Sequence, residues 1–227
     1  MAHLNDAPET KRGILLLPLP VTMLLFASFG VLATYASMEL WSAMANAKQP
    51  LLWWAGRALG FFAYFALWLS MVFGALVSSS GGGGMFSKKW VMDFHQEWTI
   101  AAFVATALHV FVLVSHNESR VTPWASIVPF ASSRLTDEIA LGTIAFIGFG
   151  VIAFSSWMRT RIPYTVWRAI HAMSFVVMLL ALAHSIVTGT DSASWAANWL
   201  YIGSSAALTA VIAVRIGVAF ASMRRTG

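Results

Sequence analysis

Four histidines lie in pairs inside two long apolar stretches of this 227-residue chain, at residues 93–116 and 167–191, and a fifth, His116, ends the first stretch. Each stretch holds one pair: His95 and His109 in the first, His171 and His184 in the second. Thirteen residues separate the members of the first pair, and twelve separate those of the second. A histidine inside a lipid-spanning helix is costly and marks a functional site by default, so two similar pairs need a common explanation.

The spacing along a helix fixes the depth of each histidine. At about 1.5 Å per residue, His109 lies about 21 Å beyond His95, and His184 lies about 20 Å beyond His171. If the two helices run parallel, the imidazoles form an inner pair, His95 with His171, and an outer pair, His109 with His184. Two such levels in a hydrocarbon layer about 30 Å thick suit two stacked haems, each held by two histidines.

Other roles remain open to these histidines. A single intramembrane histidine can serve only as a hydrogen-bonding group between helices. A proton relay would use nearby carboxylates, and Asp93 and Glu97 at the inner mouth are the nearest ones. A zinc or di-iron site fits the pattern less well than either, because ligand pairs about 20 Å apart along a helix cannot converge on one ion.

The angular positions of the histidines agree less well than their depths. At about 100° per residue, His95 and His109 lie within roughly 40° of each other, whereas His171 and His184 are roughly 140° apart on an ideal helix. We therefore expect either a tilt, a twist or a local irregularity between His171 and His184, or two haems that sit at different angles around this helix. His116 lies about 31 Å past His95, too far to meet His184, and we interpret it as an interfacial loop residue.

Two arginines and two glycines stand at depths that suit haem binding. Haem propionates need cations or donors, and Arg57 and Arg168 lie near the outer and inner levels respectively. Arg168 is explained equally well by the excess of positive charge on the cytoplasmic side, whereas Arg57 lies on the side where positive charge is disfavoured. Gly60 and Gly74 lie approximately at the two levels. Glycine lets a macrocycle approach the backbone, although small residues also serve helix packing.

Membrane-spanning helices must position these side chains. The chain is 59% hydrophobic and 10% charged, and several apolar stretches exceed the roughly 18 residues that indicate a membrane span. A soluble protein of this size could not bury so much apolar surface. The basic residues are scattered rather than clustered, which argues against a nucleic-acid partner. Because cysteine is absent, thiolate ligation and c-type haem attachment are excluded.

The apolar pattern predicts an all-α membrane protein, a bundle of six transmembrane helices with two stacked haems between helices three and five. The spans are expected at about residues 13–36, 55–78, 94–115, 139–158, 165–188 and 197–219. Tails at residues 1–12 and 221–227 then flank one haem-binding domain at residues 13–220. The run at residues 78–84 is a solvated linker, because a phosphate loop requires a preceding strand. The polar segment at residues 117–138 is expected to lie on the membrane face.

The distribution of basic residues predicts the orientation of the chain. If both termini are cytoplasmic, ten Lys and Arg residues lie on the cytoplasmic side and four on the other. This excess favours a multi-pass protein of the cell membrane with N- and C-termini in the cytoplasm. Tryptophans are expected at both membrane boundaries, as in an aromatic belt, and only Trp68 falls in the middle of a span.

Short motifs accompany the histidine pairs. The run Gly56-Arg57-Ala58-Leu59-Gly60 precedes the first pair, Trp167-Arg168 comes just before the second, and Thr188-Gly189-Thr190-Asp191 follows it. Together with the unequal histidine spacings, these motifs resemble the ferric reductase-like transmembrane domain family over roughly residues 50–220. That family includes ferric reductases, NADPH oxidases and the haem-bearing membrane subunit of the bacterial methionine sulfoxide reductase system.

The resemblance implies two b-type haems that carry electrons across the membrane. Larger family members add a cytosolic flavin and nicotinamide domain, but these 227 residues contain no Gly-x-Gly-x-x-Gly motif. We therefore expect a redox partner protein or a quinone to supply or accept the electrons. The alternatives are a terminal reductase of metal ions, oxygen or quinone at the outer haem edge, and a non-catalytic haem-bearing subunit of a larger redox complex.

Overall fold

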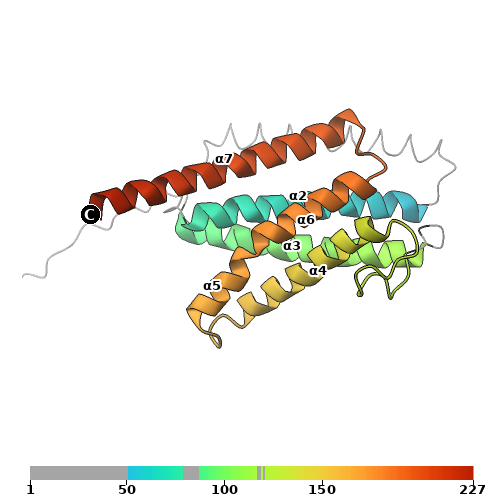
Figure 1. Ribbon diagram of the computed structural model, residues 1–227, viewed down its shortest axis with the longest axis horizontal. Helices are drawn as coiled ribbons and strands as arrows, with labels where there is room; N and C mark the ends of the chain where they lie inside the picture. The colour runs from blue at the N-terminus through green and yellow to red at the C-terminus, as the bar shows by residue number, and fades with distance from the viewer. Residues whose placement is uncertain (1–50, 79–86, 117–118, 120, 227) are drawn as a thin grey trace, which may run out of the picture.

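The computed structural model describes residues 51–78, 87–116, 119 and 121–226, and all regular structure in these ranges is helical. The helices are α2 (Leu51–Ser78), α3 (Lys88–Ser115), α4 (Thr136–Trp157), α5 (Tyr164–Ala172), α6 (Ser174–Thr188) and α7 (Trp195–Thr226), as shown in Figure 1. The predicted N-terminal tail, the first predicted span and the glycine run at residues 81–84 lie outside the described residues.

Four helical stretches are long and apolar enough to cross a membrane. They are Leu51–Ala75, Lys88–Ser115, Thr136–Trp157 and Tyr164–Thr188, the last of which comprises α5 and α6. These stretches confirm an all-helical membrane protein and correspond to the second to fifth predicted spans. Helix α7 overlaps the sixth predicted span, and its 32 residues give a length of about 48 Å, enough to cross a bilayer. The total of six spans stays a prediction.

Local sequence signals set the starts of the helices that carry or face the histidines. The Ser87 hydroxyl caps α3 by accepting a hydrogen bond from the Trp90 N–H at 3.1 Å. Helix α4 begins after Leu135, which adopts a left-handed conformation with φ of 48°, and its first turn contains Asp137 and Glu138. Carboxylates in the first turn stabilise a helix N-terminus. Helix α5 begins directly after Pro163.

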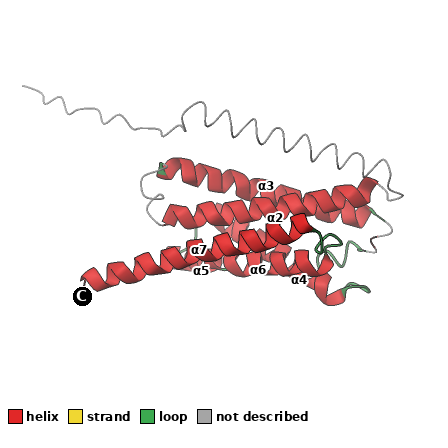
Figure 2. Ribbon diagram, turned by 90° about the horizontal axis from the view of Figure 1, so that it is seen from above, coloured by secondary structure: helices red, strands yellow, loops and turns green. Residues whose placement is uncertain are grey.

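The helices pack in two main pairs, α2 with α3 and α4 with α6, and α7 packs on α2 (Figures 1 and 2). A central apolar cluster holds the pairs together; it consists of Ala66, Ala102, Ala145, Phe149, Ile152 and Val177. Ala66 and Ala102 are fully buried, and such small residues let membrane helices approach closely. In sequence, the members of the cluster lie between the two histidine levels, so the cluster fixes the helices that position both levels.

Helix α7 is attached to α2 by polar contacts within the apolar region. Trp68, the tryptophan predicted in mid-span, donates from its Nε1 to the carbonyl of Ser204 at 2.9 Å. The hydroxyls of Tyr64 and Ser204 are also hydrogen-bonded, at 2.7 Å. A buried indole or phenol usually finds a polar partner, and these two find theirs on the neighbouring helix.

The fifth predicted span is interrupted between its two histidines. Met173 separates α5 from α6, with φ of −64° and ψ of −10°, and its N–H bonds to the carbonyl of Ile170, three residues earlier, at 3.0 Å. A turn of this type advances by about 120° per residue rather than 100°. The extra rotation at this break reduces the angle between His171 and His184 below the roughly 140° of an ideal helix. In Figure 1, the helix changes direction between the labels α5 and α6.

Candidate functional site

The structure brings the inner pair of histidines together. The rings of His95, from α3, and His171, from α5, have centroids 6.1 Å apart and planes inclined by 82°. The two residues are 76 positions apart in sequence, so the assembly of the bundle creates this pair. Their depths agree with the levels expected from the helical rise.

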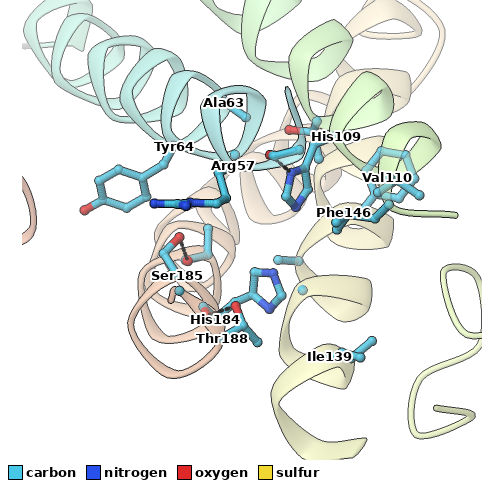
Figure 3. A pocket seen from close by; sticks show the side chains of 18 of the residues that line it. Arg57, Ala63, Tyr64, His109, Val110, Ile139, Phe146, His184, Ser185 and Thr188 are labelled. Atoms are coloured by element: carbon cyan, nitrogen blue, oxygen red, sulfur yellow. Dashed lines mark hydrogen bonds between the residues drawn. The ribbon is translucent and has the colours of Figure 1, made fainter. Parts of the chain in front are cut away.

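The outer pair lies at a cavity of about 450 Å³. His109 and His184 both line it, and Figure 3 shows their rings pointing into the same space from α3 and α6. Phe146, Phe149 and Val177 contribute apolar walls. The volume falls within the roughly 300–1,000 Å³ that is typical of cofactor sites.

Three of the four histidines donate a hydrogen bond to a main-chain carbonyl of a neighbouring helix. The bonds run from Nδ1 of His95 to Ser70 (2.8 Å), from Nδ1 of His109 to Gly56 (2.7 Å) and from Nδ1 of His184 to Glu138 (2.8 Å). A carbonyl only accepts, so each Nδ1 carries the proton and each Nε2 keeps its lone pair. Within the described residues, no hydrogen bond engages Nε2 of these three histidines.

A glycine lies four residues after each acceptor carbonyl and faces the same imidazole. A Cβ atom added at Gly60 would lie 3.0 Å from Cε1 of His109, one at Gly74 would lie 3.0 Å from Cε1 of His95, and one at Gly142 would lie 2.6 Å from Cε1 of His184. We call each combination of acceptor carbonyl and following glycine a glycine cradle. The cradles leave room for the ring to reach the carbonyl.

Sequence reasoning singled out Gly60 and Gly74 as residues that a macrocycle approaches. In the structure, both glycines face histidine rings, and an approach of a macrocycle to them stays a prediction. Gly142 was missed because its span contains no histidine. Gly142 could have been found from its depth in α4, which corresponds to the depth of His184 in α6.

The fourth histidine is held in another way. Nδ1 of His171 lies 3.4 Å from the Ser156 hydroxyl oxygen, and the ring stacks on Trp167 with centroids 5.0 Å apart. Nε1 of Trp167 donates to the same Ser156 oxygen at 3.4 Å. The guanidinium of Arg159 lies 5.8 Å from the centroid of the Trp167 ring. An aromatic side chain and a shared hydroxyl therefore replace the glycine cradle at His171.

The two arginines singled out from the sequence have different surroundings. Arg57 lines the cavity and forms a two-point ion pair with Asp191, in which its Nε donates to Oδ2 at 2.5 Å and its Nη2 contacts Oδ1. The guanidinium also lies 4.5 Å from the centroid of the Trp54 ring. Arg168 is exposed, and its Nη1 donates to the Tyr164 hydroxyl at 3.2 Å. The geometry places Arg57, but not Arg168, at a cavity that contains histidines.

His116 lies apart from both levels. It forms the C-terminal cap of α3, is only 5% exposed and packs on Trp53 with ring centroids 6.0 Å apart. Its Nε2 is buried without a hydrogen-bond partner among the described residues. His116 is not among the residues that line the cavity. Its position at the end of α3 is the one expected from the sequence, although it is buried rather than exposed at the interface.

The family model of the ferric reductase like transmembrane component matches residues 59–182, more than half of the chain. The chain belongs to this family. Membership supports transmembrane electron transfer, and proteins of this family bind haem in general. The matched segment contains His95, His109 and His171, and it ends two residues before His184. Searches of the curated proteins and of the solved structures found no match to this chain.

Proposed function

We propose that this ferric reductase-like protein carries electrons across the bilayer through two b-type haems. His95 and His171 would hold the inner haem, and His109 and His184 would hold the outer one. Two imidazoles leave the iron without an open position, which favours electron transfer over binding of oxygen to the iron. When bound, the haems supply one-electron chemistry, and the chain supplies the ligands, their orientation and an apolar surrounding.

The observation that carries this proposal is the state of the imidazoles. The carbonyl bonds of His95, His109 and His184 keep a proton on Nδ1 and leave the lone pair on Nε2. A second partner of this kind fixes the tautomer and orientation of most metal-binding histidines. Imidazole nitrogen is also a suitable ligand for iron. The side chains therefore fit the proposed group in chemistry and in direction.

The spacing of the inner pair supports the same role. Bonds between imidazole nitrogen and a metal are about 2 Å long, so two rings that share one metal ion have centroids roughly 6 Å apart. The observed separation between His95 and His171 is 6.1 Å. The outer pair has a cavity of about 450 Å³ for the cofactor, with the Arg57 guanidinium on its lining as a donor for a carboxylate.

The surroundings of the site are part of the proposal. We propose that residues 13–220 form one domain with six spans in the cell membrane and that the tails at residues 1–12 and 221–227 are cytoplasmic. The donor or acceptor of the electrons is a redox partner protein or a quinone. Arg168 then serves mainly as an anchor at the cytoplasmic face, because its observed partner is Tyr164 of the same helix.

A reduced-minus-oxidised absorption spectrum with haem quantitation tests this proposal on the purified full chain. We expect b-type bands and two haems per chain. A folded protein that contains no haem after production with ample haem supply would overturn the proposal.

A terminal reductase at the outer level is the second candidate function. It is favoured by the residues that the segment after α3 adds to the cavity lining, Ser119, Ser126 and Arg134. A polar rim of this kind can bind a small acceptor near the outer haem edge. Purified protein supplied with an artificial reductant would then reduce a ferric chelate, oxygen or a quinone catalytically. Absence of turnover with all three acceptors would exclude this candidate.

A further inference from the structure

Helix α4 repeats the spacing of α2 but changes one residue. Gly60 and Gly74 of α2 are fourteen residues apart and face His109 and His95. On α4, Gly142 faces His184, and the residue fourteen positions later is Ser156, which faces His171. Ser156 therefore occupies the place where a fourth glycine cradle would have its glycine.

The carbonyl that would complete this fourth cradle is already engaged. The residue four positions before Ser156 is Ile152, and its carbonyl accepts a hydrogen bond from the Ser155 hydroxyl at 2.9 Å. Among the described residues, the hydrogen-bond partner of His171 Nδ1 is the Ser156 oxygen, at 3.4 Å. The carbonyl bonds of the other three histidines are 2.7–2.8 Å long. A hydrogen bond weakens as the distance between donor and acceptor increases, so the contact of His171 is the weakest of the four.

The Ser156 oxygen also serves a second donor. Nε1 of Trp167 donates to it at 3.4 Å, the same length as the contact with His171. The Trp167 ring stacks on His171 with planes inclined by 25°, so tryptophan and histidine approach one hydroxyl together. Stacking fixes the plane of the imidazole, while the shared oxygen provides a weaker acceptor than an unshared carbonyl.

We infer that Ser156 is a positioning residue that holds His171 through its hydroxyl and thereby raises the reduction potential of the inner haem above the value that a fourth glycine cradle would give. This inference rests on the proposed function. An acceptor at Nδ1–H increases the basicity of a metal-bound imidazole. A more basic ligand stabilises the ferric iron, which carries one positive charge more than the ferrous iron. A weaker acceptor at His171 therefore favours the reduced state.

Two neutral substitutions in the full haem-loaded chain test this inference. Ser156→Asn supplies a carbonyl oxygen like those of the cradles, and Ser156→Ala removes the acceptor. We expect redox titration followed by absorbance to show an inner potential that is lower in Ser156→Asn and higher in Ser156→Ala. The expected change in the equilibrium constant for one-electron reduction is at least threefold in each direction, which corresponds to about 28 mV. The outer potential should stay constant.

Gly150→Ala is the control, because Gly150 lies on the same helix and an added Cβ there would have nothing within 4 Å. The low-spin ferric resonance of the inner haem in electron paramagnetic resonance should change in the Ser156 variants and not in the control. Loss of the inner haem from Ser156→Ala with its retention in Ser156→Asn would also support the inference, since the asparagine restores an oxygen acceptor.

Three outcomes overturn the inference while the proposed function stands. They are an inner potential that moves no more than in Gly150→Ala, a shift in the same direction in both Ser156 variants, and loss of the inner haem from both. The last would mean that the volume of residue 156 matters rather than its oxygen. A parent protein without haem would instead overturn the proposed function itself, so the two failures are distinguishable by the haem content.

Discussion

Each glycine cradle acts on its imidazole in two ways at once. The carbonyl fixes the proton on Nδ1, and the missing side chain of the glycine leaves space for the ring. The space for the ring is most restricted at Gly142, where an added Cβ would lie 2.6 Å from Cε1 and 2.9 Å from Nε2 of His184. The glycine and the histidine therefore have to be considered as one unit.

Gly142→Ala should displace the His184 ring and remove the outer haem. The added methyl group lies closer to the ring than van der Waals contact allows, and its neighbour is the imidazole itself. We expect the haem content to fall from about two per chain to about one, as measured by haem quantitation of the purified variant. Gly150→Ala is the control, because Gly150 lies on the same helix and has nothing within 4 Å of its would-be Cβ. Equal haem contents in the two variants would contradict the role of the cradle.

His109→Ala should remove the outer haem and leave the inner one. His109 contributes to the outer cavity alone, and the contact between His95 and His171 does not involve it. The expected spectrum retains b-type bands with about half of the parental amplitude. His116→Ala provides the comparison, because His116 is on the same helix, seven residues later, and is directed toward Trp53. Loss of a haem from His116→Ala would show that the pairing of His109 with His184 is wrong.

At the scale of the elements, the ion pair of Arg57 and Asp191 joins α2 to the segment after α6. Both side chains are about one quarter exposed, 26% and 27%, so the pair is less screened than one at the surface. Two-point contact between a guanidinium and a carboxylate is a strong form of this interaction. The pair therefore closes the outer end of the bundle beside the cavity.

Asp191→Asn should destabilise the outer end of the bundle. We expect a loss of about 1–2 kcal/mol, the range for a hydrogen bond to a charged group reduced for partial exposure, measured by thermal unfolding in detergent. Asp93→Asn serves as the control, since the Lys89–Asp93 pair lies within one helix and is much more exposed. It should produce no measurable change. If both substitutions had the same effect, the outer ion pair would not contribute as proposed.

The depth of the histidines could be predicted from the sequence, but their angular positions could not. Depth depends on the rise per residue, which hardly varies between helices, so the spacing of His95 and His109 was sufficient. The break at Met173 depends on how α5 packs against α4, and the apolar pattern of the span is unchanged across it. Gly142 and Ser156 were not singled out, because their roles follow from the register of α4 against α6 and α5 respectively, which local sequence does not encode.

The starts of the helices could likewise be predicted only in part. Helix α4 begins at Thr136, three residues before the predicted span, and its first turn contains Asp137 and Glu138. Helix α3 begins at Lys88, six residues before the predicted span, because Ser87 caps the helix ahead of the apolar stretch. The partner of Arg57 was not predicted, although Asp191 belongs to a motif that was noted. Asp191 lies 134 residues from Arg57, and a contact of that range is created only when the bundle assembles.

At the scale of the whole molecule, the two histidine levels lie in series across the bundle. They are about 20 Å apart along the helices, and the apolar cluster of Ala66, Ala102, Phe149 and Val177 lies between them. Water is excluded from such a core, so under the proposed function an electron that crosses the protein would use both levels in turn. The charged and exposed residues Lys88 and Arg159 lie at the inner end of the bundle, and under the proposed function a redox partner would meet the inner level there.

Electron flow across a sealed membrane should therefore require every histidine of both pairs. We expect vesicles that contain the purified protein and enclose ferricyanide to oxidise a membrane-impermeant reductant added outside. His95→Ala and His109→Ala should each reduce the rate at least tenfold, because each removes one of the two haems that an electron must pass through. His116→Ala should transfer electrons at the parental rate. Absorbance of the enclosed ferricyanide gives the rate directly. Transfer that persists in His109→Ala at the parental rate would mean that the outer level is not on the route, and the protein would then deliver electrons by the inner haem alone.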